Sequence, residues 1–291
     1  MANNSMAPPV LLSVAGFDPS CGAGIAADLK TFAVLDCYGV AAITALTVQS
    51  TQGVKAVEPV SPAVLRAQLD TLAEDLEIAA VKIGMLANRD NAAVVAEFLD
   101  RTALARVVLD PVAKPSSGGP ELLDAEGLKF LREELIKRAA VITPNIEEAE
   151  LLTGIEVRDL AGMKSAAQKL VEMGARAAIV KGGHMEKPID VLFDGSEIVT
   201  FGGDQIKSGH THGTGCTFSS AIAAQLAGGR PLAEATTLAK AYVTKAIEHG
   251  FAIGKGPGPV NPFYRFRQDP AGRTVRTDLH TMHPAVEPTL R

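Results

Sequence analysis

Short apolar runs alternate with amphipathic stretches along most of the chain. The runs are rich in Val, Ile, Leu and Ala and end in glycine or polar residues, which is typical of buried parallel strands. Between them, apolar residues recur at the spacing of one helix face. This alternation predicts βαβ units, a mostly parallel sheet and helices on both of its faces. The strand-like runs are 10–15, 40–48, 79–83, 106–109, 140–142 and 177–180, and the helical stretches are 24–35, 62–75, 88–102, 124–137, 145–153, 160–173, 214–227 and 231–249.

A hairpin is expected near residue 195. Two further apolar runs, 189–193 and 197–201, are joined there by Asp194-Gly195. Asp-Gly is a strong signal for a two-residue hairpin turn, so we expect an antiparallel edge on the otherwise parallel sheet.

The 291 residues contain no internal repeat and no linker, so we expect one domain over residues 10–267. Residues 1–9 are expected to be a disordered leader, and the polar, proline-bearing residues 268–291 a flexible C-terminal tail. The net charge of −5 and the lack of a basic run argue against nucleic acid or an anionic membrane as a partner. The chain has no apolar run of roughly 18 residues and no signal peptide pattern. We therefore expect a cytoplasmic α/β protein.

The stretch Ser208–Ser220 joins a glycine-punctuated turn to a helix of small apolar residues. Such a turn leaves several backbone N–H groups unpaired at the positive end of the helix, which is a favourable site for an anion such as phosphate. Cys216 would lie in the first turn of this helix, where the pKa of a thiol tends to fall. His210-Thr-His212 has a spacing seen in metal sites, but no further ligand is evident nearby.

Polar residues also follow three of the later strand-like runs. Asp110 could hold Mg²⁺ through water beside phosphates, or could simply form an Asp-Pro turn. Lys181, before Gly182-Gly183, could neutralise a transferring phosphoryl group, or could be an exposed lysine at a turn. Asn145 with Glu148 three residues later forms a capping-box pattern, which accounts for both residues without any chemistry.

The N-terminal half contains a possible binding loop. Gly22-Ala-Gly-Ile-Ala-Ala27 fits a dinucleotide fingerprint, but Phe17–Cys21 separate it from the preceding strand, so a substrate loop fits better. Asp28 could reach a ligand or be a solvated helix acid. Gln49 could bind the edge of a heteroaromatic ring or serve a turn. Met85 could pack on a ring face, although an ordinary core methionine is more common.

The chain has no Walker loop and no protein-kinase signature. The order of its motifs resembles the ribokinase-like superfamily, and within it the hydroxymethylpyrimidine kinase/phosphomethylpyrimidine kinase family of thiamine biosynthesis. The segments that carry this resemblance are Ala15–Ser20, Gly22–Ile25, Ala27–Thr31, Ile43–Leu46, Lys82–Leu86, Thr143–Asn145, Lys181–His184, His212–Cys216 and Gly254–Pro259.

The resemblance implies a three-layer α/β/α fold and ATP-dependent phosphorylation of 4-amino-5-hydroxymethyl-2-methylpyrimidine to the monophosphate and then the diphosphate. It implies ATP and Mg²⁺ as cofactors, leaves a monovalent cation open, and implies a homodimer. The implied pyrimidine-binding residues are Gly16, Asp28, Thr47, Gln49, Met85 and Val112. The implied Mg²⁺ ligands are Asp110 and Glu148, and ATP is expected at Asp110, Asn145, Glu148, Lys181, Thr211, Gly213 and Gly215. Phosphoryl transfer is expected at Lys181, Gly213, Thr214, Gly215 and Cys216.

The chain departs from the family pattern in three places, one of which is Asn261-Pro262, where the family often has histidine. Ala113–Gly119 differs from the usual family text in a segment expected to border the phosphate of the acceptor, and Cys21 replaces a common glycine. Cys216 occupies a position that is aspartate in most ribokinase-like enzymes. Three alternatives stay open: a pyridoxal kinase of the same branch, a non-catalytic pyrimidine-binding sensor, and a dehydrogenase.

Overall fold

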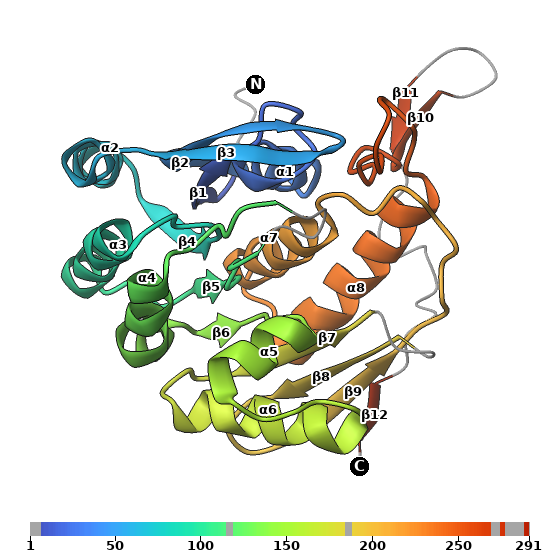
Figure 1. Cartoon of the computed structure of the whole chain (residues 1–291). Coiled ribbons are helices and arrows are strands. Elements are labelled where there is room, and N and C mark those ends of the chain that lie inside the picture. Colours follow the sequence, from blue (N-terminus) through green and yellow to red (C-terminus); the bar gives the residue numbers. More distant parts are fainter. Residues whose placement is uncertain (1–6, 115–118, 184–187, 269–273, 277–287, 291) are drawn as a thin grey trace, which may run out of the picture.

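The computed structural model describes residues 7–114, 119–183, 188–268, 274–276 and 288–290. One ten-stranded sheet runs through it in the order β12-β9-β8-β7-β6-β5-β4-β1-β2-β3 (Figure 1). No helix among the described residues is long and apolar enough to span a membrane. The strands are β1 (Val10–Phe17), β2 (Tyr38–Ser50), β3 (Gly53–Pro59), β4 (Ile78–Ile83), β5 (Val107–Leu109), β6 (Val141–Ile142), β7 (Ala178–Gly182), β8 (Ile189–Phe193), β9 (Ile198–Gly202), β10 (Phe266–Gln268), β11 (Thr274–Arg276) and β12 (Pro288–Leu290).

Six neighbouring strands in the middle of the sheet are parallel, as predicted: β2, β1, β4, β5, β6 and β7 in sheet order. Antiparallel strands flank them on both sides. The predicted hairpin is confirmed as β8 and β9, and the Asp194 carboxylate accepts the N–H groups of Ser196 and Glu197 in its turn. The sequence did not predict β3, which pairs antiparallel with β2 at the opposite edge.

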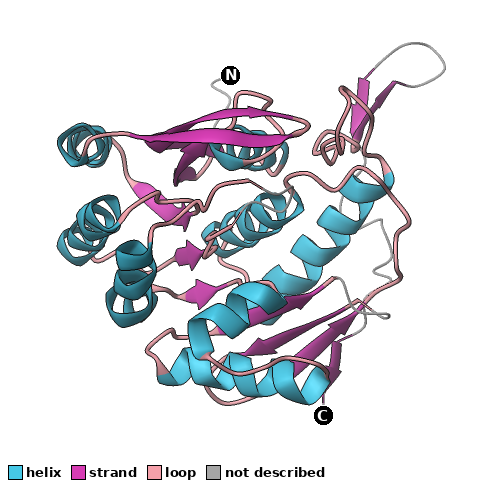
Figure 2. Cartoon of the chain, in the orientation of Figure 1, coloured by secondary structure: helices cyan, strands magenta, loops and turns pink. Residues whose placement is uncertain are grey.

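Helices cover both faces of the sheet (Figure 2). Leu11 of β1 packs in the core formed with α1, α7 and α8, while the next residue, Leu12, packs in the core formed with α2 to α6. This alternation follows from the two-residue period of a strand. The helices are α1 (Gly24–Val34), α2 (Pro62–Asp75), α3 (Arg89–Thr102), α4 (Ala125–Phe130), α5 (Ile146–Thr153), α6 (Leu160–Glu172), α7 (Thr214–Ala227) and α8 (Leu232–Glu248), with a π turn Leu131–Leu135 and a 3₁₀ turn Ile136–Arg138 after α4.

The helices on the α2-to-α6 face begin at side-chain caps. Each capping oxygen accepts a backbone N–H of the first turn and so replaces a missing intrahelical partner. Helix α7 differs, because its capping residue is Gly213 in a left-handed conformation and no described side chain caps it. The side-chain caps are Ser61, Asn88, Asp124, Asn145 and Asp159.

The carboxyl ends of the parallel strands meet at one edge of the sheet, where ligands bind in open α/β folds. The loops after β1, β4, β5, β6 and β7 therefore bring distant polar residues together. In the predicted tail, β11 pairs with β10 and β12 adds to the sheet beside β9. The rest of that tail, residues 1–6 of the predicted leader and most of the 113–119 segment lie outside the described residues.

Candidate active site

Asp110 and Lys181 form an ion pair at the carboxyl edge of the sheet. The Lys181 Nζ lies 2.9 Å from the Asp110 Oδ1, although 71 positions separate the two residues. Thr143 and Ser219 donate to the same carboxylate at 3.3 and 3.2 Å. Burial raises the pKa of Asp110, but the charges of Lys181 and Lys82 outweigh this and hold it below the usual value. Asp110 is therefore an ionised carboxylate in a buried position.

The predicted capping box at the start of α5 is confirmed. Glu148 N–H donates to the Asn145 Oδ1 at 2.8 Å, and Asn145 N–H donates to the Glu148 Oε2 at 2.9 Å. Burial raises the pKa of Glu148 to about 7; Lys181 opposes this rise and Asp110 adds to it. One Glu148 oxygen is thus committed to the cap, and the acid titrates near neutrality.

The first turn of α7 faces the Asp110–Lys181 pair. Gly213 has φ +83°, and a Cβ added to it would lie 1.9 Å from the Gly22 carbonyl oxygen, so only glycine fits. A Cβ at Gly215 would lie 3.4 Å from the Lys181 Nζ and 3.7 Å from the Asp110 Oδ2. Helix geometry gives the N–H groups of Gly215 and Cys216 no partner within α7. The positive end of this helix therefore points at the ion pair.

Thr211 and Thr214 close the turn before α7. The Thr214 N–H and hydroxyl both donate to the Thr211 carbonyl oxygen, at 3.2 and 2.7 Å. The glycine-punctuated turn predicted within Ser208–Ser220, called the anion turn from here on, is thus present before α7.

The expected fall in the pKa of Cys216 is wrong. Burial raises the pKa of its thiol to about 11; Lys82 lowers it, Asp28 and Asp110 raise it, and a hydrogen bond from the Gly24 backbone lowers it. The position at a helix start favours a thiolate, but the loss of water and the two carboxylates outweigh that effect.

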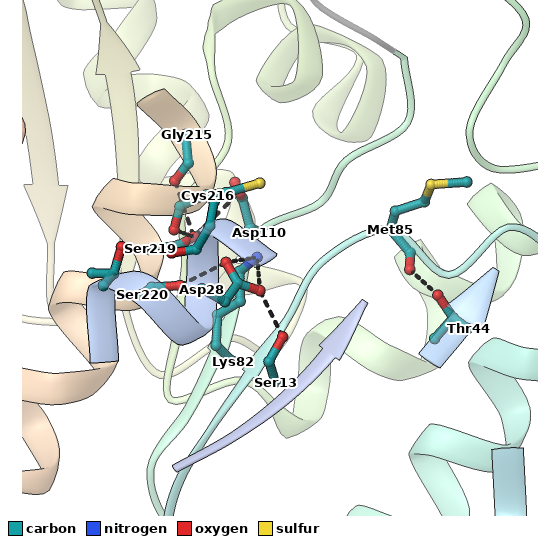
Figure 3. A network of polar contacts seen from close by, with 12 residues as sticks. Ser13, Asp28, Thr44, Lys82, Met85, Asp110, Gly215, Cys216, Ser219 and Ser220 are labelled. Carbon is teal, nitrogen blue, oxygen red and sulfur yellow. Dashed lines mark hydrogen bonds and ion pairs between the residues drawn. The ribbon is translucent and has the colours of Figure 1, made fainter. Parts of the chain in front are cut away.

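Asp28 lies inside the protein, paired with Lys82. Its side chain is fully buried, and the Lys82 Nζ lies 2.9 Å from both carboxylate oxygens. Ser13 and Ser220 donate to the same carboxylate at 2.6 and 2.8 Å (Figure 3). The donors to the Asp28 oxygens are protein groups, and the expected role of Asp28 in binding the pyrimidine stays a prediction.

The other residues expected at the pyrimidine lie near the ends of β1, β2, β4 and β5. A Cβ at Gly16 would lie 2.8 Å from the Met85 Sδ. The Thr47 Oγ1 donates to the Phe17 carbonyl oxygen and also lies 3.0 Å from the Gln49 Oε1. Met85 and Val112 belong to a small apolar cluster separate from the two main cores, which also contains Ala45, Val54, Val57, Ala87 and Leu122.

Asp18 and His212 were missed as a pair. The His212 Nε2 lies 2.8 Å from the Asp18 Oδ2 and 3.4 Å from the Gln49 Nε2. Asp18 also accepts the N–H groups of Gly22 and Ala23, at 3.2 and 3.0 Å. Burial raises the pKa of Asp18, but the bonds from His212 and Ser20 bring it below the usual value. His212 therefore joins the loop after β1 to the anion turn. The sequence drew attention to His212 through the His210-Thr-His212 spacing and the family resemblance, but neither indicated Asp18 as its partner.

A model of the family described as phosphomethylpyrimidine kinase matches residues 18–261, which include both halves of the site. The chain belongs to this family. It is 46% identical over 255 residues to the hydroxymethylpyrimidine/phosphomethylpyrimidine kinase of Bacillus subtilis, with 87% of this chain and 94% of that protein covered.

Two further similarities bear on function. The thiamine biosynthesis bifunctional protein ThiED of Geobacter sulfurreducens is 45% identical over 253 residues, which cover 86% of this chain and 51% of that protein. The structure of Staphylococcus aureus pyridoxal kinase in complex with ADP superposes with a TM-score of 0.85 at 32% identity, covering 98% of this chain and all of that one. The fold is thus that of the ribokinase-like vitamin kinases, as predicted from the sequence.

Proposed function

We propose that this protein uses ATP to phosphorylate the hydroxymethyl group of 4-amino-5-hydroxymethyl-2-methylpyrimidine, and then phosphorylates the monophosphate to the diphosphate, in thiamine biosynthesis. The family and the names of the relatives support the substrate. The observation that carries the proposal is the first turn of α7, which has no side-chain cap and faces Lys181 and Asp110. A helix start of this kind binds phosphate.

Several residues around this turn would bind ATP, each through a different group. The N–H groups of Gly215 and Cys216 would hold the transferring phosphoryl group, and the Lys181 ammonium would neutralise its charge. Thr211 orders the turn through its carbonyl oxygen, and Asn145 would lie beside the nucleotide as the cap of α5.

Mg²⁺ fits the acids at this edge. Among the described residues, no three His, Cys, Asp or Glu side chains converge on one point, so Asp110 and Glu148 would bind the ion together with water and phosphate oxygens, as Mg²⁺ prefers. The raised pKa of Glu148 reflects in part the negative charge of Asp110. A cation between the two carboxylates would relieve that repulsion, and it would supply charge neutralisation for the phosphates.

The acceptor would enter from the side of Gln49 and Met85. Gln49 can offer both a donor and an acceptor to the edge of an aminopyrimidine, and Met85 can pack on the ring face. The hydroxymethyl oxygen would then bond to the γ-phosphorus as the bond from that phosphorus to the bridging oxygen breaks and ADP leaves. Cys216 takes the hydroxyl proton only as a thiolate, and with a pKa of about 11 it needs neighbouring positive charge to reach that state. A homodimer and a monovalent cation are further proposals that follow from the family.

The test is ATP turnover on a panel of acceptors: hydroxymethylpyrimidine, its monophosphate and pyridoxal. We expect the highest kcat/KM with hydroxymethylpyrimidine, with the diphosphate appearing as the second product. The control is Lys181→Met, which should abolish turnover on every acceptor. A clear preference for pyridoxal would replace this proposal with a pyridoxal kinase, and tight pyrimidine binding without ADP release would replace it with a sensor.

A further inference from the structure

Lys82 and Asp28 form a fully buried ion pair in the core behind the anion turn. Both side chains have 0% exposure, and the two Nζ–Oδ distances are 2.9 Å. Burial lowers the pKa of Lys82, but Asp28, Cys216 and Asp110 outweigh this and raise it above the usual value, so the ammonium stays charged. In Figure 3, Cys216 and Asp110 lie on one side of this pair and Ser13 lies on the other.

Matching positions of α1 and α7 tie this pair to Cys216. Ser220, one turn after Cys216, donates to the Asp28 Oδ1 at 2.8 Å. Gly24, one turn before Asp28, provides the backbone hydrogen bond to the Cys216 sulfur. Residues four apart lie on the same helix face. The two helices therefore face each other, with the Cys216 sulfur at the first turn of both helices and the Lys82–Asp28 pair one turn further along them.

Lys82 extends toward the carboxyl edge of the sheet. A Cβ at Gly84 would lie 3.0 Å from the Lys82 Nζ and 3.2 Å from the Ala15 Cβ. Gly84 follows β4 and Ala15 lies near the end of β1, where the site lies. The charged groups that act on Cys216 are thus Lys82 from β4, Asp28 from α1, Asp110 after β5 and Lys181 from β7.

Stability alone does not account for such a pair. A buried ion pair contributes little net stability, because the cost of removing both charges from water offsets their attraction, and apolar residues of similar size often do as well. The protein has a second buried pair of the same kind, Lys240–Asp190 at 2.6 Å. This second pair joins α8 to β8, and neither of its members appears among the charges that act on Cys216.

We propose that Lys82 is a positioning residue for phosphoryl transfer: held by Asp28, its ammonium stabilises negative charge at Cys216 and the first turn of α7 from inside the protein, while Lys181 does so from the open side. The part of this inference that concerns phosphoryl transfer rests on the proposed function. The effect on Cys216 does not, because it can be measured without substrate.

The decisive experiment compares two paired variants, Lys82→Met/Asp28→Asn and Lys240→Met/Asp190→Asn. Each removes one buried ion pair without leaving a lone charge. The rate of Cys216 alkylation by iodoacetamide is measured at fixed pH by peptide mass spectrometry, and kcat and KM are measured with ATP and hydroxymethylpyrimidine. A one-unit rise in a thiol pKa lowers the thiolate fraction about tenfold.

We expect the Lys82/Asp28 variant to be alkylated at Cys216 about three- to tenfold more slowly, with kcat down roughly 100-fold and the KM for ATP little changed. The Lys240/Asp190 variant should stay within about twofold of wild type in alkylation. A loosened fold exposes the thiol and speeds alkylation, so a slower rate cannot come from lost stability. Unchanged or faster alkylation in the Lys82/Asp28 variant would overturn the proposal.

If that variant does not fold, the alkylation rates of the Ser220→Ala and Ser13→Ala variants test the proposal instead. Each keeps every charge and removes one donor from Asp28, which leaves more of its negative charge to offset Lys82. We expect alkylation of Cys216 to slow about two- to threefold in both variants, and wild-type rates in both would refute the inference. Slower alkylation in a protein that lacks pyrimidine kinase activity would refute the proposed function alone.

Discussion

Helices α5 and α7 begin at the same edge of the sheet, yet their first turns are completed in opposite ways. In α5, Asn145 and Glu148 bond to each other's backbone N–H groups. In α7, the capping position is Gly213, which has no side chain to offer. The protein itself completes the first helix start, whereas the second has no side-chain cap for its N–H groups.

The difference shows how a short change in sequence decides which helix start keeps its N–H groups free of a side-chain cap. Both helix starts have the same orphan N–H groups and the same dipole. Asn-x-x-Glu supplies acceptors and a carboxylate that repels phosphate, while Gly-Thr-Gly-Cys supplies neither. Lys181 lies between the two and pairs with Asp110 opposite Gly215. The contrast predicts that changes in the first turn of α7 affect turnover more than changes in the first turn of α5, where Glu148 would act only through Mg²⁺.

The largest effect is expected for Gly213→Ala. The new methyl group would meet the Gly22 carbonyl oxygen at 1.9 Å, in a conformation that alanine adopts at a cost. The N–H groups of α7 should therefore move, and kcat should fall about 1000-fold. Gly154→Ala is the matched control, because Gly154 ends α5 with φ +74° and has nothing within 4 Å. It should cost about 1 kcal/mol of stability and leave kcat unchanged, and equal kcat losses in both variants would remove the contrast.

A smaller effect is expected for Cys216→Ala. We expect kcat to fall about 100-fold, while ATP and pyrimidine binding, measured by calorimetry, persist. Cys37→Ala, which removes a buried thiol just before β2, at the amino edge of the parallel strands and so opposite the site, should keep wild-type turnover. Unchanged turnover in Cys216→Ala would show that the thiol is neither the base nor an essential part of the anion turn.

The smallest effect concerns Glu148 and pH. Its pKa of about 7 in the folded protein lies above the ordinary 4.5, so the folded state binds its proton more tightly than the unfolded state does. Its stabilising contribution is therefore complete below about pH 4.5 and is lost as the pH rises toward 7. Glu148→Gln cannot ionise, so it should be more stable than wild type above pH 7 by roughly 2 kcal/mol. Urea unfolding at pH 5 and pH 8 measures this, and identical pH dependence in the two proteins would contradict it.

The sequence predicted most of the fold because its pattern is local. The helix over 62–75 was predicted at the residues that α2 occupies, and the central strands lie within two residues of their predicted starts. It failed at β3, an edge strand whose alternation is weak: Val54 is buried, but Ala56 and Val57 are both partly exposed. The regular helix expected over 124–137 changes to a π turn at Leu131, which the apolar spacing does not reveal.

The site was only partly predictable because its electrostatics depend on contacts between distant residues. The backbone features of the anion turn follow from four consecutive residues and were confirmed. The pKa of Cys216 depends on burial and on Asp110 and Asp28, which no local pattern shows. The partner of Asp28 is Lys82, 54 positions away, and the partner of His212 is Asp18, 194 positions away.

The central claim is that the phosphoryl group lies between the first turn of α7 and the Asp110–Lys181 pair. Gly215→Ala tests it most directly, because the added methyl group would lie in this space at ordinary contact distances, 3.4 Å from the Lys181 Nζ and 3.7 Å from the Asp110 Oδ2. Alanine is also the better helix former, by up to about 1 kcal/mol. We predict a protein that unfolds at the same or a higher urea concentration while kcat/KM for ATP falls at least about 100-fold. A stable variant with wild-type kcat/KM would contradict the account.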